Sequence, residues 1–205
     1  QHVLEDVMLT SVRTLLKQHP ARHLGLAGGV FANVRLNRVL AEKLDLDEIF
    51  IFPPMGDEGL PVGGALAYLM KRDGLDRWLS HRHRLSNVYL GRDYTGEADP
   101  ALGNIAGLRR LAGDPVATAA KRLAKGEIGA VYTGRMEYGP RALGARSILA
   151  NPSRRETHDL LNQRLDRTEF MPFAPVVAAE KAAEVFDVNS VNGYACRFMT
   201  ITCDV

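Results

Sequence analysis

Residues 24–52 read LGLAGGVFANVRLNRVLAEKLDLDEIFIF, and this stretch decides the fold prediction for the first third of the chain. It opens with a short apolar run that ends in a glycine pair, and it closes with a second apolar run at residues 49–52. Between the two runs, apolar residues recur at helical spacing from about Asn33 onward. Two strands joined through a single helix form a βαβ unit, in which the strands are parallel. We therefore predict an α/β fold.

Working outward, the remaining apolar patterns and turn residues predict further elements along the chain. We expect helices at about residues 1–16, 61–72, 115–125 and 178–186, and strands at 128–132, 148–150 and 194–205. The stretch from about residue 74 to 115 is polar and contains one short strand candidate, which is typical of a connecting region. We predict domains at residues 1–75 and 116–205, joined by residues 76–115.

The overall composition is that of an ordinary globular protein. Hydrophobic residues make up 46% of the chain and charged residues 24%, and the net charge is +2. That charge is too small to indicate a nucleic-acid or membrane-surface partner, and no apolar run approaches the ~18 residues that cross a bilayer. Cys196 and Cys203 are the only cysteines and are expected to be free thiols in a reducing compartment. We therefore predict a cytoplasmic protein, with homo-oligomerisation left open.

Two loops are predicted to meet at one edge of the parallel sheet, where ligands of such folds bind. After the first strand, Gly28 and Gly29 precede a helix that begins near Asn33, and backbone N–H groups there can approach a phosphate. After the second strand, Asp57 and Glu58 lie between glycines and offer oxygen ligands for a metal ion or a ribose.

A purely structural interpretation of these loops stays open. A glycine pair after a strand is often only a turn, and an acidic pair before a helix is often only an N-cap. The chain contains neither a Walker A loop nor the glycine fingerprint of dinucleotide-binding folds, so those two phosphate sites are not supported.

A second candidate site is the segment from Gly134 to Ser147, which contains four glycine or proline residues and three arginines, Arg135, Arg141 and Arg146. A guanidinium matches phosphate or carboxylate through paired N–H donors, and Ser147 adds a hydroxyl donor. We predict an anion-binding loop in which Glu137 pairs with one arginine and holds it in position. The alternative is three solvated surface arginines. Arg164, Arg167 and Glu169, further along, are candidates for additional polar groups at this site.

These residues resemble the O-carbamoyltransferase family, which includes nodulation-factor and antibiotic carbamoyltransferases. The resemblance covers nearly all of the chain and is carried by separate stretches. They are residues 26–33 (LAGGVFAN), 53–64, 134–149 (beginning GRMEYGPRALG) and 172–175 (PFAP).

The resemblance implies a two-part enzyme. Residues 1–75 would be the C-terminal portion of an actin/hexokinase-like (ASKHA) transferase domain that binds a nucleotide and an iron-type divalent metal. Residues 116–205 would begin a carbamoyl-adenylate-forming (YrdC-like) domain, which uses carbamoyl phosphate and ATP. A small hydroxyl-bearing acceptor, such as a sugar or secondary metabolite, would then receive the carbamoyl group.

The resemblance also assigns candidate roles to single residues. The nucleotide-binding residues would be Gly28, Gly29, Asn33, Gly56 and Glu58, and Asp57 would be a metal ligand. Carbamoyl phosphate or its adenylate would be held by a catalytic set consisting of Arg135, Arg141, Arg146 and Ser147. The family's histidine metal ligands lie upstream of the matched part, and residues 165–172 depart from the family pattern at Asp166 and Met171, which leaves the acceptor open.

Because the chain opens inside a helix pattern and closes inside a strand pattern, we expect it to be part of a longer protein. We expect it to be inactive alone, because the resemblance implies histidine metal ligands and a first phosphate loop that this sequence does not contain. Two other functions remain alternatives: a sugar-kinase-like phosphotransferase that shares the nucleotide fold, and a non-catalytic scaffold module.

Overall fold

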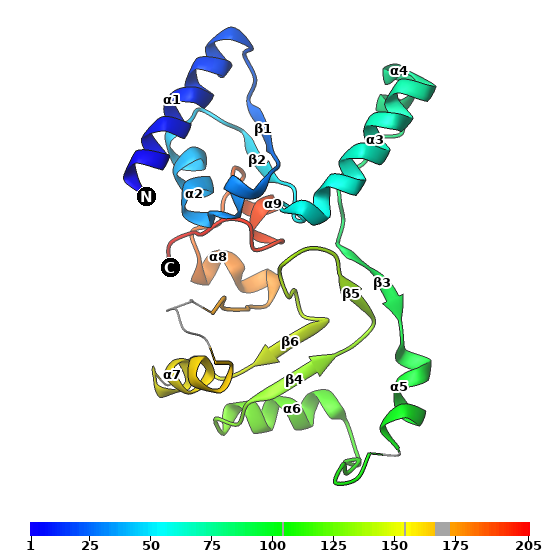
Figure 1. Ribbon diagram of the computed structural model, residues 1–205. Helices are drawn as coiled ribbons and strands as arrows, with labels where there is room; N and C mark the ends of the chain where they lie inside the picture. Colours follow the sequence, from blue (N-terminus) through cyan, green and yellow to red (C-terminus); the bar gives the residue numbers. More distant parts are fainter. Residues whose placement is uncertain (104, 154, 167–172) are drawn as a thin grey trace. The chain divides into compact units, whose positions relative to one another are not determined.

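The computed structural model describes residues 1–103, 105–153, 155–166 and 173–205, and the chain divides into two compact units (Figure 1). The first unit comprises Gln1–Val88, Tyr138–Arg141 and Val177–Val205. The second comprises Tyr89–Glu137 and Ala142–Val176. Both combine helices with small sheets, so the predicted α/β class is confirmed as a mixed α/β fold.

The first unit is built on the predicted βαβ pattern. Strand β1 (His23–Leu26) pairs in parallel with β2 (Glu48–Ile51), with Leu26 opposite Ile51, and α2 (Val34–Lys43) connects them. Helix α1 (His2–Gln18) precedes β1. The parallel pairing predicted from the two apolar runs is therefore confirmed.

The unit's remaining helices are the 3₁₀ turns η1 (Gly29–Ala32), η2 (Asp57–Gly59) and η3 (Ala179–Lys181), and the α-helices α3 (Leu60–Asp73), α4 (Leu75–Ser80), α8 (Ala182–Val185) and α9 (Gly193–Cys196).

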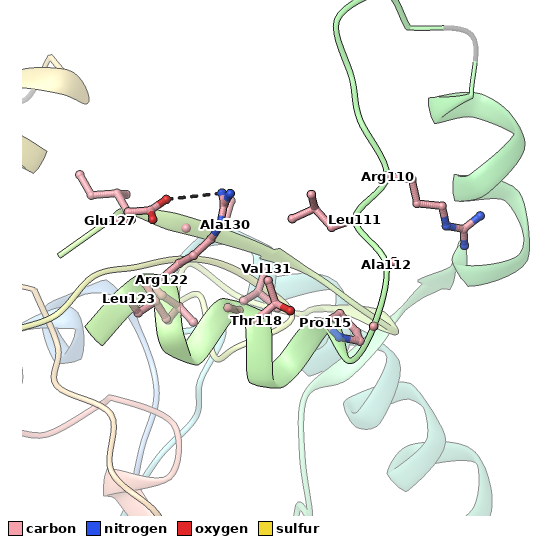
Figure 2. Close-up of a pocket in the computed structure, with 15 residues that line it drawn as sticks. Arg110, Leu111, Ala112, Pro115, Thr118, Arg122, Leu123, Glu127, Ala130 and Val131 are labelled. Atoms are coloured by element: carbon pink, nitrogen blue, oxygen red, sulfur yellow. Dashed lines mark ion pairs between the residues drawn. The ribbon is translucent and has the colours of Figure 1, made fainter. Parts of the chain in front are cut away.

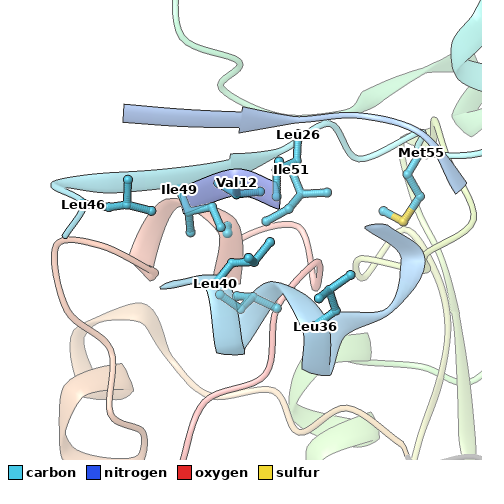
Figure 3. Packing of buried hydrophobic residues seen from close by; sticks show 10 residues of the cluster. Val12, Leu26, Leu36, Leu40, Leu46, Ile49, Ile51 and Met55 are labelled. Carbon is cyan, nitrogen blue, oxygen red and sulfur yellow. The ribbon is translucent and has the colours of Figure 1, made fainter. Parts of the chain in front are cut away.

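The core of the first unit forms where the strands meet α1, α2 and α9. Figure 3 shows Ile49 and Ile51 of β2 directed toward Leu36 and Leu40 of α2, and all four side chains are fully buried. Val12 from α1 joins the same cluster. Burial of each such side chain contributes roughly 1.5–3 kcal/mol relative to exposure, so this cluster fixes the strand edge that carries the two predicted loops.

The strand expected over residues 194–205 is wrong. The chain forms the short helix α9 there and then a turn in which Met199 has a φ of 55°. Aromatic packing explains the preference, because the ring of Tyr194 stacks on Phe50 with centroids 5.0 Å apart, and Phe198 meets both rings edge-on. A helical turn places residues 194 and 198 next to each other on one face. In a straight strand they would also share a face, but two pleat repeats would separate them along the strand.

The described residues of the second unit form two antiparallel strand pairs. Strand β3 (Tyr89–Asp93) pairs with β5 (Arg135–Glu137), and β4 (Gly129–Tyr132) pairs with β6 (Arg146–Leu149), with Tyr132 opposite Arg146. Its helices are α5 (Thr95–Leu102), α6 (Pro115–Ala124) and α7 (Arg155–Arg164). Since β6 begins at Arg146, the end of the predicted anion-binding loop is part of a sheet.

Within the described residues, no helix combines the length and apolar character needed to span a bilayer.

Candidate functional site

The loop after β1 is a glycine turn that leads into α2. Gly28 has a φ of +109°, a conformation that favours glycine, and its surroundings leave space for a small group close to the backbone. Asn33 is the N-cap of α2, because its Oδ1 accepts the backbone N–H of Leu36 at 3.0 Å. Its Nδ2 donates to the side chain of Gln1 at 2.8 Å. Asn33 therefore has a helix-capping role whether or not it contacts a ligand.

The loop after β2 contains the acidic pair. Glu58 Oε1 accepts the backbone N–H of Gly56 at 3.2 Å, and Asp57 is exposed at the start of η2. Gly59 is essential to the turn, because a Cβ there would lie 2.2 Å from the carbonyl oxygen of Pro54. Because β1 and β2 are adjacent and parallel, this loop and the glycine loop both follow the carboxyl end of a strand. They therefore lie at the same end of the sheet, which we call the β1–β2 edge.

The implied metal does not fit the ligand set that this chain provides. Asp57 offers one carboxylate, and the described residues contain no cluster of three or more His, Cys, Asp or Glu side chains that could hold an ion. His19 and His23 have the spacing of a helical metal-binding pair, but α1 ends at Gln18 and β1 begins at His23. We therefore derive no step through a metal.

Four residues from the predicted anion-binding segment belong to the first unit. The backbone N–H of Tyr138 donates to the carbonyl of Val88 at 2.7 Å, and its hydroxyl donates to the carbonyl oxygen of Glu58. Arg141 Nη2 donates to the carbonyl oxygen of Ala32 at 3.2 Å. Arg141 thus lies among the residues at the β1–β2 edge, while Arg135 and Arg146 belong to the second unit.

In the second unit, Glu137 is the anion that the loop's own backbone binds. Its Oε1 accepts N–H groups from Leu143 at 2.8 Å, Ala145 at 2.6 Å and Arg146 at 3.3 Å. Burial alone would raise the pKa of this carboxyl, but backbone N–H groups, including its own, outweigh burial and hold the pKa below its usual value. The prediction that Glu137 pairs with an arginine side chain is wrong, because its carboxylate is occupied by the backbone.

Arg146 is held rigidly at the start of β6. Its guanidinium carbon lies 3.6 Å from the centroid of the Tyr132 ring. Nη1 donates to the carbonyls of Thr133 and Ala145, both at 2.8 Å, and Nη2 donates to that of Gly134 at 3.1 Å. These bonds use three of the five guanidinium N–H donors and leave two for a ligand.

The other two predicted residues of the second unit differ from Arg146 in their surroundings. Ser147 Oγ accepts the backbone N–H of Gly144 at 3.0 Å, so its oxygen supports the loop. Arg135 is an exposed residue of β5. Arg146 and Ser147 are consecutive residues of β6, so their side chains point to opposite faces of the strand. Arg167, Glu169 and Pro172, singled out in the sequence, lie outside the described residues.

Two family models match the chain on either side of the polar connecting stretch. The model described as Carbamoyltransferase N-terminus matches residues 1–66, and the one described as Carbamoyltransferase C-terminus matches residues 120–205. The chain belongs to the carbamoyltransferase family.

Curated relatives agree with that membership. Nodulation protein NolO of Bradyrhizobium diazoefficiens is 36% identical over 92% of this chain and 34% of its own length. Nodulation protein U of Azorhizobium caulinodans is 33% identical over 94% of the chain and 33% of its own length. An uncharacterised protein of Methanocaldococcus jannaschii is 34% identical over 91% of the chain and 31% of its own length. The chain spans about a third of the length of the curated relatives it matches.

The second unit of this carbamoyltransferase chain also contains a cavity of about 510 Å³ between α6, β4 and the segment before α6 (Figure 2). Leu111, Leu123 and Val131 give it apolar walls, and Arg122 pairs with Glu127 across 3.4 Å beside it. None of the predicted site residues in the described part of the chain lines this cavity.

Sequence reasoning missed Tyr138 as a residue of the first unit and Tyr132 as the support for Arg146. A signal for Tyr132 was available, because an aromatic residue at the end of one strand can pair across the sheet with an arginine on the next. The contact between Tyr138 and Glu58 spans 80 positions and had no local signal.

Proposed function

We propose that the protein containing this chain transfers a carbamoyl group from carbamoyl phosphate, by way of an ATP-derived carbamoyl-adenylate, to a hydroxyl of a sugar or secondary metabolite. Membership of the carbamoyltransferase family supports carbamoyl transfer in general. In this proposal the first unit belongs to an actin/hexokinase-like transferase domain and the second to a carbamoyl-adenylate-forming domain.

The observation that carries the proposal is the fixed guanidinium of Arg146. Three carbonyls and the Tyr132 ring hold it in place before any ligand arrives, and two donors remain for phosphate oxygens. A pre-positioned cation of this kind needs little reorganisation as negative charge develops on a phosphate or pyrophosphate group. Arg135, exposed on β5, supplies a second positive charge in the same unit.

The proposed reaction has three steps, and each has a named nucleophile and a named leaving group. Water displaces phosphate from carbamoyl phosphate and leaves carbamate. A carbamate oxygen attacks the α-phosphorus of ATP and displaces pyrophosphate, which gives carbamoyl-adenylate. The acceptor hydroxyl then attacks the carbamoyl carbon, AMP leaves with the bonding electrons, and the hydroxyl proton passes to a base. Arg146 would bind phosphate charge in the first two steps, and the loops with Gly28, Gly29, Gly56 and Glu58 would hold the nucleotide during transfer.

The proposal is tested by carbamoyl-phosphate-dependent exchange of labelled pyrophosphate into ATP, measured with the full-length protein. We expect exchange in the wild type and a loss of about 100-fold or more in Arg146→Ala, the magnitude typical of a lost electrostatic contact at a reacting centre. Lys121→Ala removes an exposed positive charge of the same unit and serves as the matched control, with exchange unchanged.

Two other outcomes distinguish the alternatives. A sugar-kinase-like phosphotransferase would form ADP with a sugar and need no carbamoyl phosphate. A scaffold module would show no exchange, and Arg146→Ala would alter only stability. We further expect the 205-residue chain alone to give no carbamoyl transfer, and measurable transfer by it would contradict that expectation.

A further inference from the structure

We propose that Tyr138 and Arg141 are positioning residues for the two loops at the β1–β2 edge, and that Arg141 does not hold carbamoyl phosphate. The inference rests on the proposed function only in taking those loops as the nucleotide-binding loops of the transfer step. All the contacts that support the inference lie within the first unit, which includes Tyr138–Arg141.

Arg141 and Asn37 together fix the peptide planes of η1. Arg141 Nη2 donates to the carbonyl of Ala32 at 3.2 Å, and Nδ2 of the fully buried Asn37 donates to the carbonyl of Phe31 at 2.8 Å. Because a peptide unit is planar, holding each carbonyl also directs the N–H group that follows it. The orientation of the N–H groups of Ala32 and Asn33 therefore depends on these two side chains.

Tyr138 performs the equivalent task for the other loop. Its hydroxyl donates to the carbonyl of Glu58, while its own N–H donates to Val88 at 2.7 Å, so the ring is anchored from both ends. Gly139 continues the contact with a φ of +118°, and a Cβ there would lie 3.3 Å from the backbone nitrogen of Pro54. The close backbone approach sets the position of the segment over residues 53–54.

The donor arrangement of Arg141 also differs from that of Arg146. Arg141 Nε is buried and has no hydrogen-bond partner among the described residues, and one protein contact, to Ala32, orients the guanidinium. The contact with Ala32 fixes one end of the guanidinium beside η1.

Hydrogen–deuterium exchange on the full-length protein, without ligand, tests the positioning role. Arg141→Met keeps an unbranched, flexible stem and removes the donors, and loss of one hydrogen bond of about 1 kcal/mol predicts about fivefold faster exchange in residues 28–33. Arg141→Lys retains a donor and should restore most of the protection. Tyr138→Phe should accelerate exchange in residues 53–60 only.

The matched control is Arg135→Met, which changes an exposed arginine of the same segment that belongs to the second unit. We expect no change in either loop for that variant, and unchanged exchange in β1 and α2 for all variants. Unaltered exchange at residues 28–33 in Arg141→Met would overturn the proposal. So would an Arg141→Lys variant that behaves like Arg141→Met, since the donor would then be irrelevant.

A second measurement separates this inference from the proposed function. In the full-length protein, carbamoyl transfer by Arg141→Met should fall and Arg141→Lys should recover most of it, because the loops that Arg141 positions serve the transfer step, while Arg146→Met should lose carbamoyl-phosphate-dependent pyrophosphate–ATP exchange. Loss of exchange in Arg141→Met would overturn the positioning role in favour of a contact with the reacting groups. Absence of exchange in the wild type would contradict the proposed function, and the deuterium result would still decide the structural inference.

Discussion

The carboxylate oxygen Oε1 of Glu137 lies 2.6 Å from the backbone nitrogen of Ala145, and it also accepts N–H groups from Leu143 and Arg146. One buried oxygen therefore gathers three donors of the loop that connects β5 with β6. Three backbone N–H groups of the loop are therefore already bound by a carboxylate of the chain itself. Its capacity to bind an external anion accordingly depends on side chains, with Arg146 the best placed.

Replacing Glu137 by Gln should destabilise the chain by about 1–2 kcal/mol at pH 7, because hydrogen bonds to a charged acceptor are stronger than those to an amide oxygen. The pKa of the Glu137 carboxyl is lowered by its N–H donors, so its contribution is complete above its ordinary value of 4.5 and is lost as pH falls through the lower folded value. Urea denaturation of both proteins at pH 7 and at pH 3–4 should therefore show a difference that shrinks in acid.

Glu127→Gln is the control for that measurement, because Glu127 forms an exposed pair with Arg122 at 3.4 Å and should contribute well under 1 kcal/mol. A Glu137→Gln effect that is the same at both pH values would show that the carboxylate charge is not what stabilises the loop.

Alanine at Gly139 should be more destabilising than alanine at Gly144. Both glycines have positive φ, +118° and +105°, so each substitution strains the backbone by roughly 1–3 kcal/mol. At Gly139 the added Cβ also approaches Pro54 N at 3.3 Å, whereas the space at Gly144 is open. Thermal or urea unfolding of the two variants checks the order, and equal losses would mean that residues 53–54 yield without cost.

Substitution of Asn33 by Ala should cost about 1 kcal/mol of stability, since it removes the N-cap of α2. Asn33→Asp and Asn33→Ser retain an oxygen that accepts the Leu36 N–H and should stay close to wild type. The comparison is made by urea denaturation. If all three variants lose the same stability, the Asn33 contact to Gln1, and not the cap, is the stabilising one.

Cys196 should be a slow thiol in the folded chain. Burial, with a further contribution from Cys203, raises the pKa of Cys196 to about 12. At pH 8 only on the order of one molecule in ten thousand would then carry the reactive thiolate. In a Cys203→Ser variant, labelling of Cys196 by an aromatic disulfide reagent should be at least about 100-fold slower in buffer than in urea. Equal rates would contradict burial of the sulfur.

The sequence was most informative where the pattern is local and periodic. Helix α1, the parallel pair β1–β2 and the presence of α3 followed from apolar spacing and from proline near a helix start. The shared edge of Gly28 and Asp57 followed from the rule for parallel strands. The expected strand at residues 194–205 failed because packing of Tyr194 and Phe198 on Phe50 overrides a short apolar pattern.

The sequence alone therefore determined the chemical character of the candidate site residues and the family of the chain. Guanidinium groups, glycine turns and family patterns depend only on which residues occur and in which order. Only the tertiary structure decided which group each residue serves. Arg141 and Arg146 are five positions apart, yet one donates to Ala32 in the first unit and the other to Gly134 in the second. The physical reason is that a carbonyl acceptor exists at every residue. Which carbonyl a side-chain donor binds is decided by the packing within each unit. That packing brings together residues that are distant in the sequence, and no local spacing encodes it.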